Sequence, residues 1–200
     1  GTSLELGGDN GNANATNGSA VVNQTSGTVT SGSGNNYIEI GAGTNAYGCY
    51  NLSGGTLTTP NNGNASGIRV GATGLGMLVQ SGGTLTCNRY FAVGTQTGNL
   101  GPGGQGVATF TGGSTSIGAA GYRPILGDKP SGNAVMNIGT EAGGNASVAS
   151  VSVNSGNWGV EFLDNPGNAA LNLDSGTLQT AGNVSENNHS GTAKFNLDRK

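Results

Sequence analysis

Few residues in this 200-residue chain are suited to acid–base chemistry. The ten acidic residues mostly stand alone, and the one close pair is Glu161 and Asp164. Trp158 precedes this pair, and its indole ring could stack on a sugar. A polysaccharide hydrolase or lyase needs paired carboxylates, or a carboxylate cluster with a base and a metal. The same residues also fit a strand edge followed by a turn at 164–167, and this is the interpretation we favour.

Nucleophilic and metal chemistry have even less support in the sequence. His189 is the only histidine and lies in a polar run of Asn, Ser and Gly. Cys49 and Cys87 are too few for a disulfide framework or a zinc site. A bridge between them is left open, but two unpaired, small apolar residues is the preferred interpretation. The glycine-rich run 101–106 matches a dinucleotide fingerprint by letters only, because no helix follows it. We therefore expect no enzyme, no metal site and no cofactor.

The charge pattern excludes several classes of partner. Seven Lys and Arg against ten Asp and Glu give a formal net charge of −3, and charged residues make up only 8% of the chain. The basic residues are scattered, so no basic stripe is available to neutralise phosphates. No heptad pattern and no long apolar run is present, which excludes a coiled coil and a transmembrane helix. We expect neither nucleic-acid binding nor membrane insertion in this segment.

The composition by itself is typical of a disordered chain. Gly, Asn, Thr, Ala and Ser occupy 125 of the 200 positions. So much Gly, Asn, Ser and Thr destabilises helices, and large apolar residues are scarce. An internal repeat argues against disorder, because regular spacing is the mark of a stacked architecture.

The repeat has two elements. The first is a glycine followed by a hydroxyl residue, at spacings of 28, 28, 30 and 63, and its hydroxyl positions are Thr28, Thr56, Thr84, Ser114 and Thr177. The last spacing fits two units, one with an insertion. The second element is an apolar–x–apolar–Gly run at 4–7, 38–41, 68–71, 91–94 and, more weakly, 124–127.

These elements predict three short strands per repeat. The alternation in Ile38-Glu-Ile40 is typical of a strand with one buried face. The glycine pairs at 54–55 and 82–83 predict corners that need a positive φ or a close backbone approach. Beyond each corner, Thr-Leu-Thr would turn one apolar residue inward and two hydroxyls outward. The Asn- and Gly-rich stretches 9–19, 95–106 and 128–133 are expected to form loops along one edge.

One such repeat cannot bury its apolar face alone, so the repeats must stack. The sequence predicts an all-β parallel β-helix (β-solenoid) of six to seven coils, with three short strands and about 28–30 residues per coil. Two ladders of like residues would fill the interior, Val22, Tyr50, Leu78, Ala108 and Leu171 in one, and Val29, Leu57, Leu85, Thr115 and Leu178 in the other. We expect residues 1–200 to form one domain. Within it, 134–157 would be a degenerate coil with strands at 135–138 and 149–153 and an insertion at 140–147.

The repeat units also resemble a known family. The Ser-Gly-Gly-Thr-Leu-Thr units at 53–58 and 81–86, alternating with apolar–x–apolar–Gly strands, resemble the autotransporter-associated β-strand repeats of large secreted bacterial proteins. Similar repeats occur in proteins that carry PEP-CTERM sorting signals. The resemblance covers about residues 4–198. It implies an extracellular or cell-surface β-helix that serves as an adhesin, a stalk or a matrix component.

The hydroxyl units support an alternative function. The candidate ligand-binding residues are Thr28, Thr30, Thr56, Thr58, Thr84 and Thr86, continued by Ser114 and Ser116, with Trp158 as a separate candidate. Two outward hydroxyl columns of this kind resemble the ice-binding faces of some β-helical antifreeze proteins, and a carbohydrate is a second possible ligand. The simpler interpretation is that threonine suits strands and solvates a sheet with few charges.

The ends of the solenoid predict a partner. No polar capping helix is evident at either end, and an uncapped sheet exposes unpaired strand edges. We therefore expect either flanking repeats in a longer protein or end-to-end association into a fibre. A glycan or another surface ligand is left open as a further partner.

Overall fold

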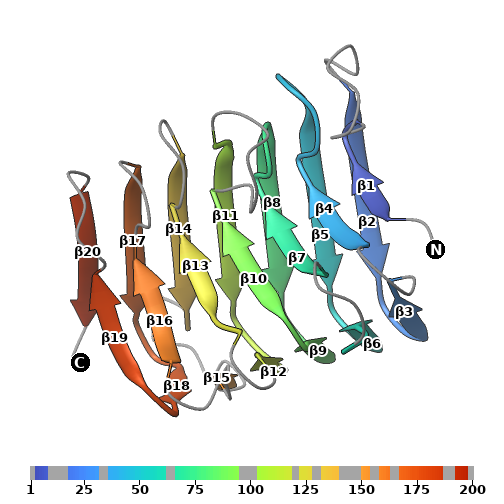
Figure 1. The fold of residues 1–200 in the computed structure, drawn as a ribbon. Coiled ribbons are helices and arrows are strands. Elements are labelled where there is room, and N and C mark those ends of the chain that lie inside the picture. Colours follow the sequence, from blue (N-terminus) through green and yellow to red (C-terminus); the bar gives the residue numbers. More distant parts are fainter. Residues whose placement is uncertain are drawn as a thin grey trace.

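The structure, a computed structural model, describes residues 3–8, 18–31, 36–61, 66–94, 103–118, 122–127, 132–139, 150–153, 158–162, 167–186 and 192–197. Within these ranges it contains twenty strands, and every strand pairs parallel to its neighbours in one of three sheets (Figure 1). The prediction of an all-β parallel β-helix is confirmed. The described residues include no helix with the length and apolar character needed to cross a membrane.

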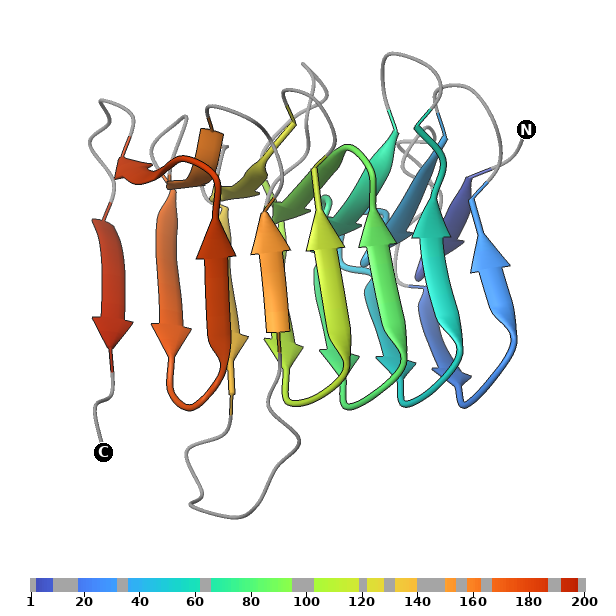
Figure 2. The ribbon, with the colours of Figure 1, turned by 90° about the horizontal axis from the view of Figure 1, so that it is seen from below.

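Each coil contributes one strand to each sheet, and Figure 2 shows the same stack from below. Sheet A consists of β1 (Leu4–Leu6), β4 (Tyr37–Ile40), β7 (Gly67–Val70), β10 (Tyr90–Val93), β13 (Pro124–Leu126), β16 (Trp158–Phe162) and β19 (Asn183–Glu186). Sheet B consists of β2 (Ser19–Gln24), β5 (Tyr47–Leu52), β8 (Leu75–Gln80), β11 (Gln105–Phe110), β14 (Asn133–Ile138), β17 (Asn168–Leu173) and β20 (Thr192–Leu197). Sheet C consists of β3 (Thr28–Thr30), β6 (Thr56–Thr59), β9 (Thr84–Cys87), β12 (Ser114–Ile117), β15 (Ser150–Val153) and β18 (Thr177–Thr180). The described strands thus make six complete coils and two strands of a seventh.

The long spacing in the repeat is explained by β15. Ser150 pairs with Ser114 on one side and with Thr177 on the other, so the interval of 63 residues is two coils. The strands of the degenerate coil keep the common register, because β14 pairs along its whole length with both β11 and β17. The predicted insertion at 140–147 lies outside the described residues.

The sequence-based strand limits need two corrections. The strands of sheet B begin about three residues earlier than expected, at Ser19, Gln105 and Asn133, so the ends of the three predicted loops are strand. The rest of those loops lies outside the described residues, apart from Gly18, Gly103, Gly104 and Gly132. The repeat pattern also did not identify β16 and β19 as copies of the first strand. The sequences of these two strands lack the apolar–x–apolar–Gly pattern. They are nevertheless strands because they pair with their neighbours in sheet A, β16 with β13 and β19 with β16.

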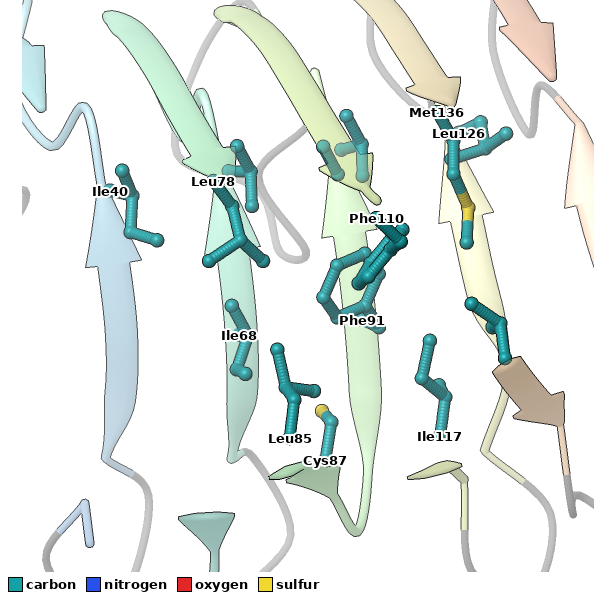
Figure 3. Close-up of a cluster of buried hydrophobic side chains, with 14 of the residues drawn as sticks. Ile40, Ile68, Leu78, Leu85, Cys87, Phe91, Phe110, Ile117, Leu126 and Met136 are labelled. Carbon is teal, nitrogen blue, oxygen red and sulfur yellow. The ribbon is translucent and has the colours of Figure 1, made fainter. Parts of the chain in front are cut away.

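The interior holds the two predicted ladders. Leu57 pairs with Leu85 in sheet C, Tyr50 pairs with Leu78 in sheet B, and all four side chains are fully buried. Figure 3 shows residues from all three sheets, among them Ile68, Leu78, Leu85, Phe91 and Phe110, gathered between the sheets. Stacking therefore gives each coil the apolar cover that it lacks alone.

The glycine pairs form the corners between sheets B and C, as predicted. Gly55 and Gly83 have φ values of +78° and +68°, a region that residues with a Cβ rarely adopt. Gly54 and Gly82 are needed for space, since a Cβ would lie 2.2 Å from the carbonyl oxygen of Thr25 and 2.4 Å from that of Ser53. Both close contacts are with the preceding coil, so the corner glycines let successive coils stack at sheet spacing.

Candidate functional site

The outer face of sheet C carries the predicted hydroxyl residues in two straight columns. One column is Thr28, Thr56, Thr84, Ser114, Ser150 and Thr177, and the other is Thr30, Thr58, Thr86, Ser116, Ser152 and Gln179. Eleven of these twelve positions have a hydroxyl, and none has a charge. The residues between the columns, such as Leu57 and Leu85, are buried, so the columns face outward.

This geometry produces a regular array of hydrogen-bonding groups. Neighbours in a column are about 4.8 Å apart, and the two columns are separated by about 7 Å, the span of two residues along a strand. Each hydroxyl can donate one hydrogen bond and accept others, so the array can order water or meet the hydroxyls of a sugar. The array weakens beyond the third coil, where Ser replaces Thr, and ends on Gln179.

Of the predicted acidic pair, only Glu161 lies within the described residues. The Glu161 side chain is 3% exposed and forms an ion pair with Arg123 through Oε2 and Nε. Trp158 begins the same strand, and the register of β16 against β19 shifts between Trp158 and Glu161. Asp164 and His189 lie outside the described residues. The Glu161 carboxylate is therefore buried and paired with the guanidinium of Arg123.

A cluster of charged and aromatic side chains lies on the outer face of sheet A. Arg69 donates a hydrogen bond of 2.5 Å from Nη1 to Oε1 of Glu39, its strand neighbour. The Cζ atom of the same guanidinium lies 3.4 Å from the centre of the Tyr37 ring. All three residues are buried, although they lie on the outside of the sheet: Tyr37 and Glu39 alternate with the inward residues of β4, and Arg69 alternates with those of β7. The carboxylate and the aromatic ring both attract the cation, and this attraction offsets the free-energy cost of removing it from water.

A second part of this cluster surrounds Tyr122. Arg89 donates a 2.7 Å hydrogen bond from Nη1 to the Tyr122 hydroxyl, and its Cζ atom lies 4.4 Å from the centre of that ring. Tyr90 packs edge-on against Tyr122, with 4.8 Å between ring centres. Burial raises the pKa of Tyr90, so its hydroxyl stays neutral at physiological pH. The sequence carries only one signal of this cluster, which is the charged middle residue in the runs 38–41 and 68–71.

The two cysteines are unpaired and lie on different sheets. Both are buried: Cys49 is 6% exposed on the outer side of β5, whereas Cys87 ends β9 and belongs to the core. Burial raises the pKa of the Cys87 thiol to about 11, despite hydrogen bonds that lower it. Among the described residues, no group of three or more His, Cys, Asp or Glu side chains is placed to hold a metal ion.

The outer face of sheet B combines an amide ladder with an apolar column. Asn51 donates from Nδ2 to Oδ1 of Asn23 at 2.8 Å, and Asn172 donates in the same way to Asn137 at 2.7 Å. Beside this ladder, the middle positions of the strands are mostly apolar, at Val21, Cys49, Met77, Val107, Val135 and Ala170. A hollow of about 390 Å³ lies where the short Ala170 side chain separates Val135 from Lys194.

A second hollow lies at the corner between sheets A and B. It measures about 590 Å³ and is lined by residues of three successive coils, among them Tyr47, Thr73 and Gln105. The described residues that line these two hollows include no acidic residue and no histidine.

Comparisons of the chain with protein-family models, with curated proteins and with solved structures found no match.

Proposed function

We propose that this protein is a structural or adhesive rod of the bacterial cell surface or extracellular matrix, which acts without catalysis. Its coils would stack from one copy to the next, or onto flanking repeats, to build a longer rod or fibre. The extracellular and adhesive parts of the proposal are supported by the resemblance of the units at 53–58 and 81–86 to autotransporter-associated and PEP-CTERM-type repeats. They are also supported by the scarcity of charge, with solvation supplied by amides and hydroxyls.

The stacking proposal rests on the exposure of inward-facing apolar side chains in the last described coil. Phe195 and Leu197 are 45% and 51% exposed, although they continue inward columns of the core. In the preceding coil, Leu171 pairs with Phe195 and is fully buried. Covering the exposed half of each side chain would contribute about 1 kcal/mol, which is half of the value for burying such a side chain fully. The exposed edge of β20 would also gain backbone hydrogen bonds.

The first coil presents a matching surface. Val22 and Val29 are only partly buried, and they begin the same ladders that Phe195 and Leu178 end. A copy added in register would place β2 beside β20 and Val22 over Phe195. Such a head-to-tail contact does not close on itself, so it repeats into a filament.

The test of stacking uses the full chain and one end-face variant. We expect particles whose length grows with concentration, seen by light scattering and electron microscopy. Phe195→Lys combined with Leu197→Lys should abolish this growth, because the added charges would have to be buried. Thr84→Lys, an exposed change on sheet C, is the control and should leave the growth intact. A monomer at every concentration, or equal growth of the end-face variant, would refute stacking.

The columns of sheet C favour a second candidate, an ice- or carbohydrate-binding face. The supporting observation is the strand register, which aligns Thr28, Thr56 and Thr84 in one column and Thr30, Thr58 and Thr86 in the other. Thermal hysteresis tests for ice binding, and a glycan array tests for sugars. Thr56→Lys should remove either activity, whereas Ser81→Lys, at an exposed corner outside the columns, should retain it. No hysteresis and no glycan binding by the unmodified chain would exclude this candidate.

A further inference from the structure

We propose that the outer face of sheet B is an interface at which two copies of this chain pack side by side. The observation that carries this inference is the strand β8, which is apolar on both faces. Leu78 points into the core and is fully buried, while Leu75, Met77 and Val79 point outward. Strands that are apolar on both faces are typical of sheets that are covered on both sides. Leu75 remains 45% exposed in the described chain.

The neighbouring coils extend this row into a patch with an apolar centre. Met77 pairs with Cys49 and with Val107, and the column runs on to Val21 and Val135. The two flanking columns are mainly polar outside β8, and consist largely of Asn, Thr, Gln and Ser. An apolar centre with a polar rim is the usual anatomy of a specific protein interface.

A second copy is the occupant that this patch fits best. Under a two-fold axis parallel to the solenoid axis, the row Leu75, Met77, Val79 would face the same row in reverse order, so apolar residues meet apolar residues. The outward positions of the seven described strands carry one charge, Lys194, so two copies would meet without strong repulsion. A strongly charged partner would find almost nothing to pair with.

The size of the face is also sufficient. Seven strands at about 4.8 Å and six residues at about 3.3 Å give a surface of roughly 30 by 20 Å. Two such surfaces would bury about 1,200 Å² in total, which reaches the lower limit of specific interfaces. Because the contact is the same on both copies, it closes as a pair and is independent of the open-ended stacking proposed above.

The test measures the mass of the full chain by sedimentation at rising concentration. In the background of Phe195→Lys with Leu197→Lys, which removes end stacking, we expect a monomer–dimer equilibrium. Met77→Lys should raise the dissociation constant at least about tenfold, because the lysine would lose water at the centre of the contact. Thr86→Lys, a half-buried outward position of the same coil on sheet C, is the matched control and should leave the constant unchanged. A monomer at every concentration, or unchanged dimerisation of a folded Met77→Lys variant, would overturn the proposal.

A cross-linking variant tests the geometry without placing a charge in the sheet. With Cys49→Ser as background, Met77→Cys should form a disulfide-linked dimer on mild oxidation, because the middle columns face each other across the axis. Thr86→Cys in the same background should not. A cross-link at position 86 with none at 77 would place the contact on sheet C and contradict the proposal.

Discussion

The hydroxyl of Thr115 donates a hydrogen bond of 2.5 Å to the side-chain oxygen Oε1 of Gln80, which lies in the preceding coil. Both residues are buried. The amide nitrogen of Gln80 donates in turn to the carbonyl oxygens of Gly83 and Ser114, at 3.3 and 3.2 Å. One buried amide therefore joins the corner of its own coil to the next coil.

A buried glutamine forms the same set of hydrogen bonds in the first coil. Oε1 of Gln24 accepts a 2.6 Å hydrogen bond from the Tyr50 hydroxyl, and its Nε2 donates to the carbonyl oxygens of Gly27 and Thr56 at 3.1 and 3.0 Å. Burial raises the pKa of Tyr50 to about 12, which keeps this donor protonated. These amides give the corner carbonyls of Gly27 and Gly83 a second hydrogen bond, beside the one that each accepts from the backbone N–H of Thr56 or Ser114.

A double-mutant cycle tests the pair of Thr115 and Gln80. Thr115→Val and Gln80→Leu should each lower the free energy of unfolding by about 1 to 3 kcal/mol, because each leaves a buried polar group without its partner. The double variant should lose less than the sum, since apolar residues then replace both partners. Denaturant unfolding followed by circular dichroism measures all four proteins. Additive losses would show that the hydrogen bond does not couple the two residues.

A glycine series separates backbone strain from close contact at the corners. Gly27 has a φ of +72°, but a Cβ there would meet no atom within 4 Å, so Gly27→Ala should cost about 1 to 2 kcal/mol from strain alone. At Gly83 a Cβ would also lie 2.6 Å from the carbonyl oxygen of Gly55. Gly83→Ala should therefore cost more, about 3 kcal/mol or above. Equal losses, measured by denaturant unfolding, would contradict the packing described here.

The buried thiol predicts a loss of stability in alkali. The pKa of Cys87 is about 11 in the folded chain and 9.0 ordinarily, so the folded state holds the proton more tightly. This contribution is complete below about pH 9 and declines as the pH rises toward 11, by about 3 kcal/mol in total. Unfolding midpoints measured across this range should fall, and Cys87→Ala should remove the part of the fall that begins near pH 9. A decline that the substitution leaves unchanged would assign it to other groups, such as Tyr50.

The ion pair of Glu161 predicts a structural effect on substitution. Glu161→Gln should destabilise the chain by about 2 to 3 kcal/mol, because Arg123 loses a buried counter-charge. Asp174→Asn is the control, a half-buried acid between β17 and β18. Thermal unfolding measures both variants. If Glu161→Gln kept full stability and abolished a polysaccharide-degrading activity, Glu161 would be a catalytic acid and the enzyme alternative would return.

Much of the fold was predictable because its signals are local and repeated. The alternation in Ile38-Glu-Ile40 sets the face of a strand, and the glycine before Thr56 or Thr84 marks a corner. Since parallel coils stack in register, equal spacing along the chain becomes contact in space, and the ladder from Leu57 to Leu85 follows directly. The strands β16 and β19 could not be predicted from the repeat pattern. Pairing with neighbouring strands can stabilise a strand whose own residues have no clear strand pattern.

Residue spacing alone therefore determined the solenoid, its glycine corners and the outward hydroxyl columns of sheet C. The tertiary structure decided how individual side chains are used: that Gln80 meets Thr115, that Arg69 lies between Glu39 and Tyr37, and that Arg123 holds Glu161. The physical reason is that a ladder depends only on the period of the backbone. A polar contact between neighbouring coils also depends on the direction of each side chain and on what covers it, and neither of these repeats along the chain.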